Sequence, residues 1–169
     1  WVWDDADPVK RNGWFDFRVF PNMSVVQGAG VGGGSLVYAN ISIEAKPDTF
    51  NAGWPAEITF AELKPYYTKV GQMLDVKPVP RAQWPERTKL MKDAADRTGR
   101  SARFQPLELA VAFDEQWSYD LPDPHALTRS KEFTNAQGVK QGTCVHLGNC
   151  DIGCDVRARN TLDLNYLPR

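Results

Sequence analysis

The sequence has no long run of apolar residues, and this absence predicts that the chain has neither a transmembrane helix nor a signal peptide. It also has no excess of charge of one sign, because 20 Lys and Arg stand against 21 Asp and Glu. A chain so close to neutrality has no electrostatic reason to bind nucleic acid or an anionic membrane. We therefore expect neither partner. A cytoplasmic location is the working expectation.

Cysteine is scarce as well. The three cysteines, Cys144, Cys150 and Cys154, lie close together near the end of the chain. A secreted scaffold held by several disulfides is thereby excluded, although one bridge stays open.

Proline and glycine, by contrast, are plentiful and divide the chain into short elements. The 169 residues contain 12 prolines and 13 glycines, which favours an irregular α+β fold with short strands and two to three helices. The chain begins at Trp1 without an initiator Met and ends just after residues 160–167, which read as the opening of a helix. Both features lead us to expect an internal fragment of a longer protein, with residues 1–169 forming one piece.

Aromatic and polar residues alternate over residues 13–20 and predict a strand that places Phe15, Phe17 and Val19 on one buried face. The segment "RFQPLELAVAF", residues 103–113, alternates in the same way and predicts a second strand. The Pro- and Asp-rich residues 117–143 predict a loop.

Two helices are expected between residues 59 and 99. Thr59 and Glu62 form a capping box, but Pro65 follows so closely that we expect a short turn and a helix from about Lys64. The second helix begins after Pro85 and stops at Gly99, with an apolar face of Leu90, Met91, Ala94 and Ala95.

The stretch "VVQGAGVGGGSLV", residues 25–37, satisfies the dinucleotide-binding pattern G-x-G-x-x-G as written. That pattern indicates a Rossmann turn only where a helix follows. Here the alternating residues Ile41, Ile43 and Ala45 come next, and Pro47 leaves no room for a helix. The glycines remain able to wrap an anion or lie against a flat ring, because no Cβ blocks the backbone. The alternative is a tight structural turn or bulge.

Three segments carry a resemblance to a known family. The run "GAGVGGGSLVYANISIEA" resembles the flavin-contacting loop of the glucose-methanol-choline (GMC) oxidoreductases, especially their cholesterol-oxidase-like branch. "GW" at Gly53 with "LKPYY" at residues 63–67 is similar to the helix that follows that loop. "CVHLGNCDIGCDVRARNTLDLNYL" resembles a later segment of the same branch. The three matches occur in the family's order and cover most of the chain.

The resemblance implies an FAD-dependent enzyme that oxidises an alcohol by hydride transfer to the flavin, with a sterol among the candidate substrates. It divides the chain into a flavin-contacting loop and arm (24–45), a helical region (59–99), a strand and loop (100–143) and a Cys/Gly turn with the start of a helix (144–169). Its implied partners are a small-molecule alcohol and the remainder of the parent flavoenzyme. The implied cofactor-binding residues are Gly30, Val31, Gly32, Gly33, Gly34, Ser35, Tyr38, Asn40, Asn160 and Thr161.

The chain also departs from the family. Many relatives carry Asn where this chain has Tyr38, and a phenol cannot reproduce the donor and acceptor pair of an amide. The family's N-terminal Rossmann βαβ unit and its catalytic histidine region have no counterpart here, and neither His125 nor His146 occupies a matching position. The catalytic residues are therefore unknown.

Cys144, His146, Cys150 and Cys154 are the residue types that bind metals, but their spacing is cramped for a Cys3His zinc site, and an iron–sulfur cubane would lack a fourth thiolate. Buried thiols or one disulfide are the simpler interpretation, and we assign no metal ligand. The cluster nevertheless leaves a second functional hypothesis open. In it the chain is a noncatalytic interaction module stabilised by a metal or by thiols, and the glycines form a structural turn.

Overall fold

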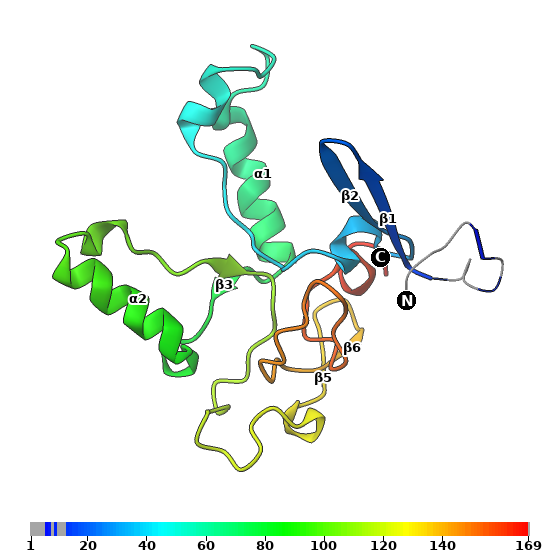
Figure 1. Ribbon diagram of the computed structural model, residues 1–169, viewed down its shortest axis with the longest axis vertical. Coiled ribbons are helices and arrows are strands. Elements are labelled where there is room, and N and C mark those ends of the chain that lie inside the picture. The colour runs from blue at the N-terminus through cyan, green and yellow to red at the C-terminus, as the bar shows by residue number, and fades with distance from the viewer. Residues whose placement is uncertain (1–5, 8, 10–12, 169) are drawn as a thin grey trace.

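The chain folds into a loop-rich body from which two helices and one hairpin project (Figure 1). The computed structural model describes residues 6, 7, 9 and 13–168, and all statements below concern these. The described residues form two α-helices and three two-stranded antiparallel sheets, which confirms the α+β class. Neither helix is long and apolar enough to cross a membrane. The elements in chain order are β1 (Phe15–Phe20), β2 (Met23–Gly28), α1 (Phe60–Met73), β3 (Lys77–Pro78), α2 (Glu86–Arg97), β4 (Glu108–Leu109), β5 (Phe133–Thr134) and β6 (Lys140–Gln141).

The strand predicted over residues 13–20 is β1, which pairs with β2 from Phe15↔Gly28 to Phe20↔Met23. Its predicted buried face is wrong. Phe15 is 5% exposed, but Phe17 is 51% and Val19 80% exposed. Only the base of the hairpin reaches the body, and the rest projects away from it (Figure 1). Phe17 stacks on Phe15 of the same strand with 5.9 Å between ring centroids, but the described residues do not bury the outer part of this face.

Helix α1 begins at Phe60 and continues to Met73, so the predicted start near Lys64 is wrong. The Thr59 hydroxyl accepts a hydrogen bond from the Glu62 amide (3.2 Å), as a capping residue should. Pro65 lies inside the helix. Because proline has no N–H, the carbonyl four residues earlier, at Ala61, loses its helical partner. Ala61 is exposed, and water can satisfy that carbonyl.

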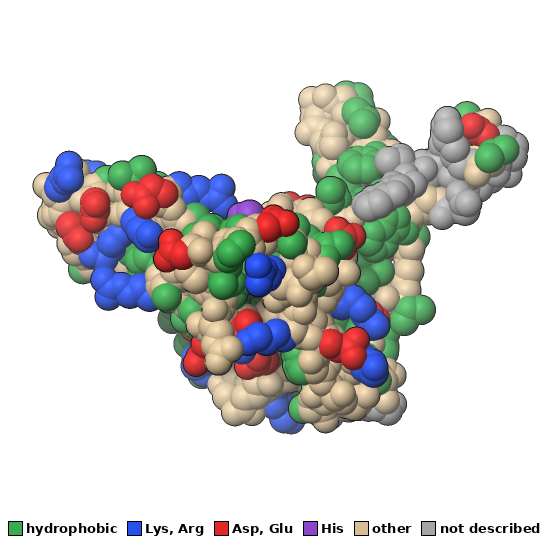
Figure 2. Space-filling model, turned by 90° about the horizontal axis from the view of Figure 1, so that it is seen from below, with side chains coloured by type: hydrophobic (Ala, Val, Ile, Leu, Met, Phe, Trp, Pro, Cys, Tyr) green, Lys and Arg blue, Asp and Glu red, His purple; other side chains and the backbone are tan. Residues whose placement is uncertain are grey.

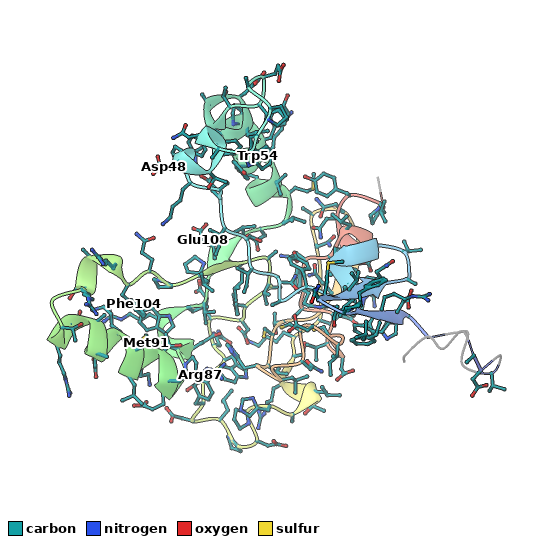
Figure 3. All side chains as sticks on the ribbon, turned by 45° about the horizontal axis from the view of Figure 1, so that its top comes forward. Asp48, Trp54, Arg87, Met91, Phe104 and Glu108 are labelled. Carbon is teal, nitrogen blue, oxygen red and sulfur yellow. The ribbon has the colours of Figure 1, made fainter. Side chains whose placement is uncertain are left out.

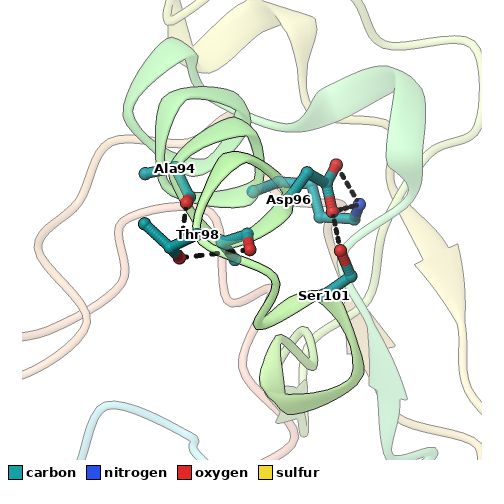
Figure 4. A network of polar contacts seen from close by, with 6 residues as sticks. Ala94, Asp96, Thr98 and Ser101 are labelled. Atoms are coloured by element: carbon teal, nitrogen blue, oxygen red, sulfur yellow. Dashed lines mark hydrogen bonds and ion pairs between the residues drawn. The ribbon is translucent and has the colours of Figure 1, made fainter.

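Helix α2 follows the predicted course, with Pro85 at its N-cap and Gly99 in a left-handed conformation (φ 67°) just beyond its end. A polar network closes its last turn (Figure 4). The Thr98 hydroxyl donates to the Ala94 carbonyl (2.8 Å), and the Asp96 carboxylate receives bonds from Lys92 and Ser101.

Neither helix contains a buried residue. On α2, Leu90 is 58% and Met91 64% exposed. Figure 3 shows Met91 on this arm together with Phe104 from the segment that follows the helix, and the Phe104 ring packs edge-on against Trp84. Acidic and basic side chains alternate over the arm (Figure 2). Hydrophobic side chains also gather at the surface elsewhere (Figure 2). The apolar faces that the sequence predicts therefore exist, but the body of this chain does not cover them.

The centre of the body is residues 108–112, which lie between several other segments. The Ala110 amide donates to the Asn40 carbonyl (2.8 Å), and the Ala112 amide donates to the Ala158 carbonyl (2.8 Å). Ala110, Val111 and Ala112 are consecutive buried residues. The predicted alternation over residues 107–113 is therefore wrong at its centre, since neighbouring segments cover both faces.

The segment predicted as a loop, 117–143, contains the short β5–β6 hairpin. Asn135 organises its turn, because its side-chain oxygen accepts bonds from the amides of Gln137 and Val139 (3.0 Å each).

The helix expected at 160–167 is reduced to a 3-10 turn over Leu162–Leu164. The Asn165 side chain donates to the Thr161 carbonyl (2.8 Å), the acceptor that an α-helix would offer to the Asn165 amide.

Candidate functional site

The Gly-rich loop, residues 28–38, is built on a 3-10 turn over Gly33–Leu36. The Gly33 amide donates to the Gly30 carbonyl (3.0 Å), and the Ser35 amide donates to the Gly32 carbonyl (3.2 Å). No α-helix begins at the glycines, and the next one along the chain is α1. The sequence-based exclusion of a Rossmann turn is therefore confirmed.

The two sides of this loop differ in what surrounds the glycines. A Cβ on Gly30 would lie 3.0 Å from Leu36, and a Cβ on Gly32 would lie 3.1 Å from Leu36 and 3.3 Å from Asp163. A Cβ on Gly33 or Gly34 would meet nothing within 4 Å. The first pair serves internal packing, whereas the second pair presents bare backbone on an open side.

Ser35 ties the loop to the C-terminal segment. Its hydroxyl donates to the Gly32 carbonyl (2.7 Å) and accepts a bond from the Leu162 amide (3.0 Å). The hydroxyl hydrogen is thus engaged within the chain, and Ser35 acts as a clamp in this geometry.

Arg159 lies beneath the loop and is 5% exposed. Its Nη1 donates to the carbonyls of Leu36 (2.9 Å), Tyr38 (3.5 Å) and Cys150 (2.5 Å). Among the described residues, no carboxylate forms an ion pair with it, and its Nε is buried without a hydrogen-bond partner. The loop therefore rests on a buried cation whose charge no described acid neutralises.

Asn40 and Asn160 both bind the carbonyl oxygen of Ala110. The Asn40 side chain donates to it (2.9 Å), and the backbone amide of Asn160 also donates to it (2.8 Å). The Asn160 side chain also donates to the Leu74 carbonyl (2.7 Å) and accepts from Gln141 Nε2 (2.6 Å). Both residues are buried and hold segments together, while Asn40 Oδ1 is a buried acceptor without a partner in the described structure.

The remaining residues that the resemblance implies for cofactor binding differ in how far they are buried. Val31 is exposed at the turn of the loop, Thr161 is buried beside Asn160, and Tyr38 is half-buried. Burial raises the pKa of the Tyr38 phenol, and the positive charge of Arg159 partly opposes this rise. The structure therefore brings the loop and the 159–163 segment together, whereas their role in binding a cofactor stays a prediction.

Sequence reasoning missed Arg159 and Asp163 as neighbours of the loop. Their contacts join residues more than a hundred positions apart in the chain, as the Arg159 to Leu36 bond shows. Arg159 stands next to Asn160, but no local pattern distinguishes it from the neighbouring Arg157, which is exposed.

The three cysteines are free thiols in the structure. The Cys144 sulfur accepts a bond from the His146 amide (3.3 Å), and the Cys154 sulfur accepts one from the Ala158 amide (3.2 Å). Burial raises the pKa of Cys144 to about 11. The described residues contain no group of three or more His, Cys, Asp or Glu side chains arranged to hold a metal ion. All three thiols are half-buried, and burial also raises the pKa of Cys150, so Cys144 and Cys150 lie in an environment that disfavours the reactive thiolate.

His146 faces away from the thiols. Its Nε2 lies 3.0 Å from Gln83 Oε1, and its ring packs on Trp117 with 4.1 Å between centroids. Burial is the main cause that lowers its pKa to about 4, and His125 adds to the effect. His146 is therefore a neutral packing residue at neutral pH.

The open side of the loop fits a flat, partly anionic group such as FAD. Gly33, with φ 54°, and Gly34 leave the backbone free of side chains, and Arg159 lies below with its charge unneutralised. Asn40 Oδ1 adds a buried acceptor without a partner. The chain thus offers a bare surface supported from beneath by polar groups.

Comparison with known proteins gives this site its context. The chain is similar to cholesterol oxidases. It is 29% identical to the cholesterol oxidase of Acinetobacter baumannii over 99% of this chain, and 34% identical to that of Mycobacterium tuberculosis, in strains CDC 1551 / Oshkosh and ATCC 25618 / H37Rv, over 89% of this chain. It spans 29% and 26% of the length of these relatives, respectively. No family model matches the chain, and no solved structure matches it. The similarity relates the chain to oxidoreductases, and its partial coverage of these relatives is consistent with the fragment interpretation.

Proposed function

We propose that this chain is part of an FAD-dependent oxidoreductase of the GMC type that oxidises an alcohol, with a sterol as the favoured substrate. The observation that carries the proposal is the bare backbone at Gly33 and Gly34 within a chain similar to proteins named cholesterol oxidase over 89–99% of its length. FAD, when bound, supplies the acceptor for the hydride that leaves the carbinol carbon.

Within this proposal the residues have distinct tasks. Gly33 and Gly34 provide the surface against which the cofactor lies, because a side chain there would occupy the same space. Gly30 and Gly32 let the loop pack closely on Leu36. Asn40 and Asn160 fix the segments beneath the loop through the Ala110 carbonyl. We assign no general base within this chain.

The exposed apolar faces have a role in the same proposal. Phe17 and Val19 on the hairpin and Leu90 and Met91 on α2 are large apolar side chains in contact with solvent. Surfaces of this kind mark sites of protein contact. We assign them to packing against the remainder of the parent flavoenzyme.

The decisive experiment uses the full-length protein that contains this chain. Gly34→Leu adds a side chain where the structure has open space, so the fold should persist while FAD is displaced. Gly71→Leu is the matched control, because a Cβ there also meets nothing within 4 Å but lies on α1.

We expect purified protein with a flavin absorbance spectrum that bleaches when a sterol alcohol is added without oxygen. Gly71→Leu should retain the spectrum, and Gly34→Leu should lose most of the bound FAD without loss of secondary structure. A colourless wild-type protein, or a Gly34→Leu variant with its full complement of FAD, would contradict the proposal.

A further inference from the structure

A buried arginine without an acidic partner is unusual, because transfer of a charge from water to the protein interior is costly unless it is compensated. Arg159 is 5% exposed, and among the described residues it is satisfied only by backbone carbonyls. Two of these carbonyls, of Leu36 and Tyr38, belong to the Gly-rich loop. The third belongs to Cys150, so the guanidinium joins the loop to the Cys/Gly turn.

Carbonyl oxygens carry partial negative charge, and they solvate the guanidinium without neutralising it. The electrostatic effect of Arg159 reaches the side chains around it, because its charge acts to lower the pKa of both Tyr38 and Cys150 against the opposing effect of burial. Asp163 is an acid beside the loop, since its Oδ1 would lie 3.3 Å from a Cβ on Gly32, but among the described residues this oxygen accepts no hydrogen bond. The electrostatic field at the loop therefore includes the unpaired positive charge of Arg159.

We propose that Arg159 is the positioning residue of the Gly-rich loop, which it holds through the Leu36 and Tyr38 carbonyls while its buried charge favours the more negatively charged, reduced state of a flavin bound on that loop. This inference rests on the proposed function for the identity of the bound group. The contacts of Arg159 and its effect on Tyr38 do not depend on it.

The first test uses the full-length protein that contains this chain and needs no bound cofactor. Arg159→Gln removes the charge but retains an amide that can donate to a loop carbonyl. Ser35→Ala is the control, because it removes the other clamp of the loop and changes no charge. The ionisation of Tyr38 is followed by ultraviolet titration. The titration curve of a Tyr38→Phe variant is subtracted, because this chain contains five tyrosines and the difference isolates the signal of Tyr38.

We expect the pKa of Tyr38 to rise in Arg159→Gln and to stay at its wild-type value in Ser35→Ala. An equal pKa in wild type and Arg159→Gln, or an equal rise in Ser35→Ala, would show that Arg159 contributes packing alone and would overturn the inference.

The second test uses the flavin-loaded full-length protein. With the flavin poised against a reference dye, the ratio of reduced to oxidised flavin should fall by about tenfold in Arg159→Gln, as expected for the loss of one nearby charge in a partly buried site. Arg159→Lys should restore the ratio, and Ser42→Ala, which removes only a long 3.5 Å contact with the Asn40 carbonyl, should leave it unchanged. A ratio that is the same in wild type and Arg159→Gln overturns the electrostatic role.

If Arg159→Gln does not fold, Arg159→Lys still decides the question. An ammonium can lose its proton when buried, whereas a guanidinium cannot. The reduction potential of the Lys variant should therefore fall more steeply with rising pH than that of wild type, and equal slopes overturn the inference. If the full-length protein binds no flavin, the proposed function fails, but the Tyr38 titration still tests the role of Arg159.

Discussion

The Ser35 hydroxyl accepts a hydrogen bond from the backbone amide of Leu162, 127 positions further along the chain. The same hydroxyl donates to the Gly32 carbonyl, so one oxygen closes the Gly-rich loop and attaches it to the C-terminal segment. We predict that Ser35→Ala lowers the free energy of unfolding by about 1–2 kcal/mol, because two partly buried hydrogen bonds are lost.

Hydrogen exchange at the Leu162 amide is the direct measurement for this clamp, and exchange should accelerate in Ser35→Ala. Ser42→Ala is a suitable control, since the Ser42 hydroxyl makes only a long contact of 3.5 Å with the Asn40 carbonyl. Unchanged protection of Leu162 in Ser35→Ala would show that the clamp does not form in solution.

Gly142 lies close against the backbone of Val156 and the side chain of Ser130. A Cβ at this position would collide with the Val156 carbonyl and with the Ser130 hydroxyl. We expect Gly142→Ala to lower the free energy of unfolding by about 2 kcal/mol, because the backbone at Val156 has to move. Urea denaturation checks this value.

Gly71→Ala provides the opposite expectation at a glycine inside a helix. Gly71 lies in α1 without a nearby atom, so alanine should stabilise the helix by about 1 kcal/mol. If both glycine variants are neutral, the close approach at Gly142 is not a feature of the folded protein.

The sequence predicted those elements whose determinants are local. Helix α2 has a proline at its start, a glycine at its stop and a regular apolar spacing, and the structure agrees with each. The predicted start of α1 near Lys64 is wrong because the Thr59 cap determines where the helix begins, and Pro65 does not prevent it. An exposed turn tolerates the hydrogen bond that Pro65 cannot make. The helix expected after Asn160 fails for a comparable reason, since the Asn165 side chain takes the carbonyl that the helix would need.

The candidate site was predicted only in part for a different reason. The glycines and their resemblance to a flavin-contacting loop are visible in the sequence, but the contacts beneath the loop are not. Gln83 and Gln141 are fully buried polar residues whose partners, His146 and Asn160, lie far along the chain. A glutamine in a sequence reads as surface, and only its partners show that it belongs to the core.

Asn160 is a further buried polar residue, and it connects several segments of the body. Its side chain donates to the Leu74 carbonyl and accepts from Gln141, while its amide donates to Ala110. Asn160→Ala should cost about 2–4 kcal/mol, because it leaves a buried carbonyl and a buried amide without partners. Thermal and urea unfolding measure the loss.

Asn160→Asp sharpens the interpretation, since it keeps the shape but replaces the donor to Leu74 with an acceptor. We expect it to be at least as damaging as alanine. Asn149→Ala, whose side chain makes one exposed 3.3 Å bond to Asp155, should be close to neutral. Comparable losses in Asn149→Ala and Asn160→Ala would rule out a special role for the buried network.

The environment of His146 predicts how the stability of the fold depends on pH. Gln83 donates its amide hydrogen to the Asp114 carbonyl (2.6 Å), so its oxygen accepts from His146 and assigns the proton of the neutral imidazole to Nε2. Burial disfavours a second proton on the imidazole and the nearby His125 adds to the effect, so the pKa of His146 falls from 6.5 to about 4.

The unfolded chain then binds more protons than the folded chain between these two pKa values. The stability contributed by neutral His146 is fully present above pH 6.5, decreases as the pH falls, and is lost once the pH passes below about 4. Urea unfolding between pH 7 and pH 4 should show this decline. His146→Asn should flatten it, because asparagine does not titrate and tolerates the positive φ of 56° at this position. Equal slopes in wild type and His146→Asn would mean that the imidazole is not held neutral by its packing against Trp117 and its bond to Gln83.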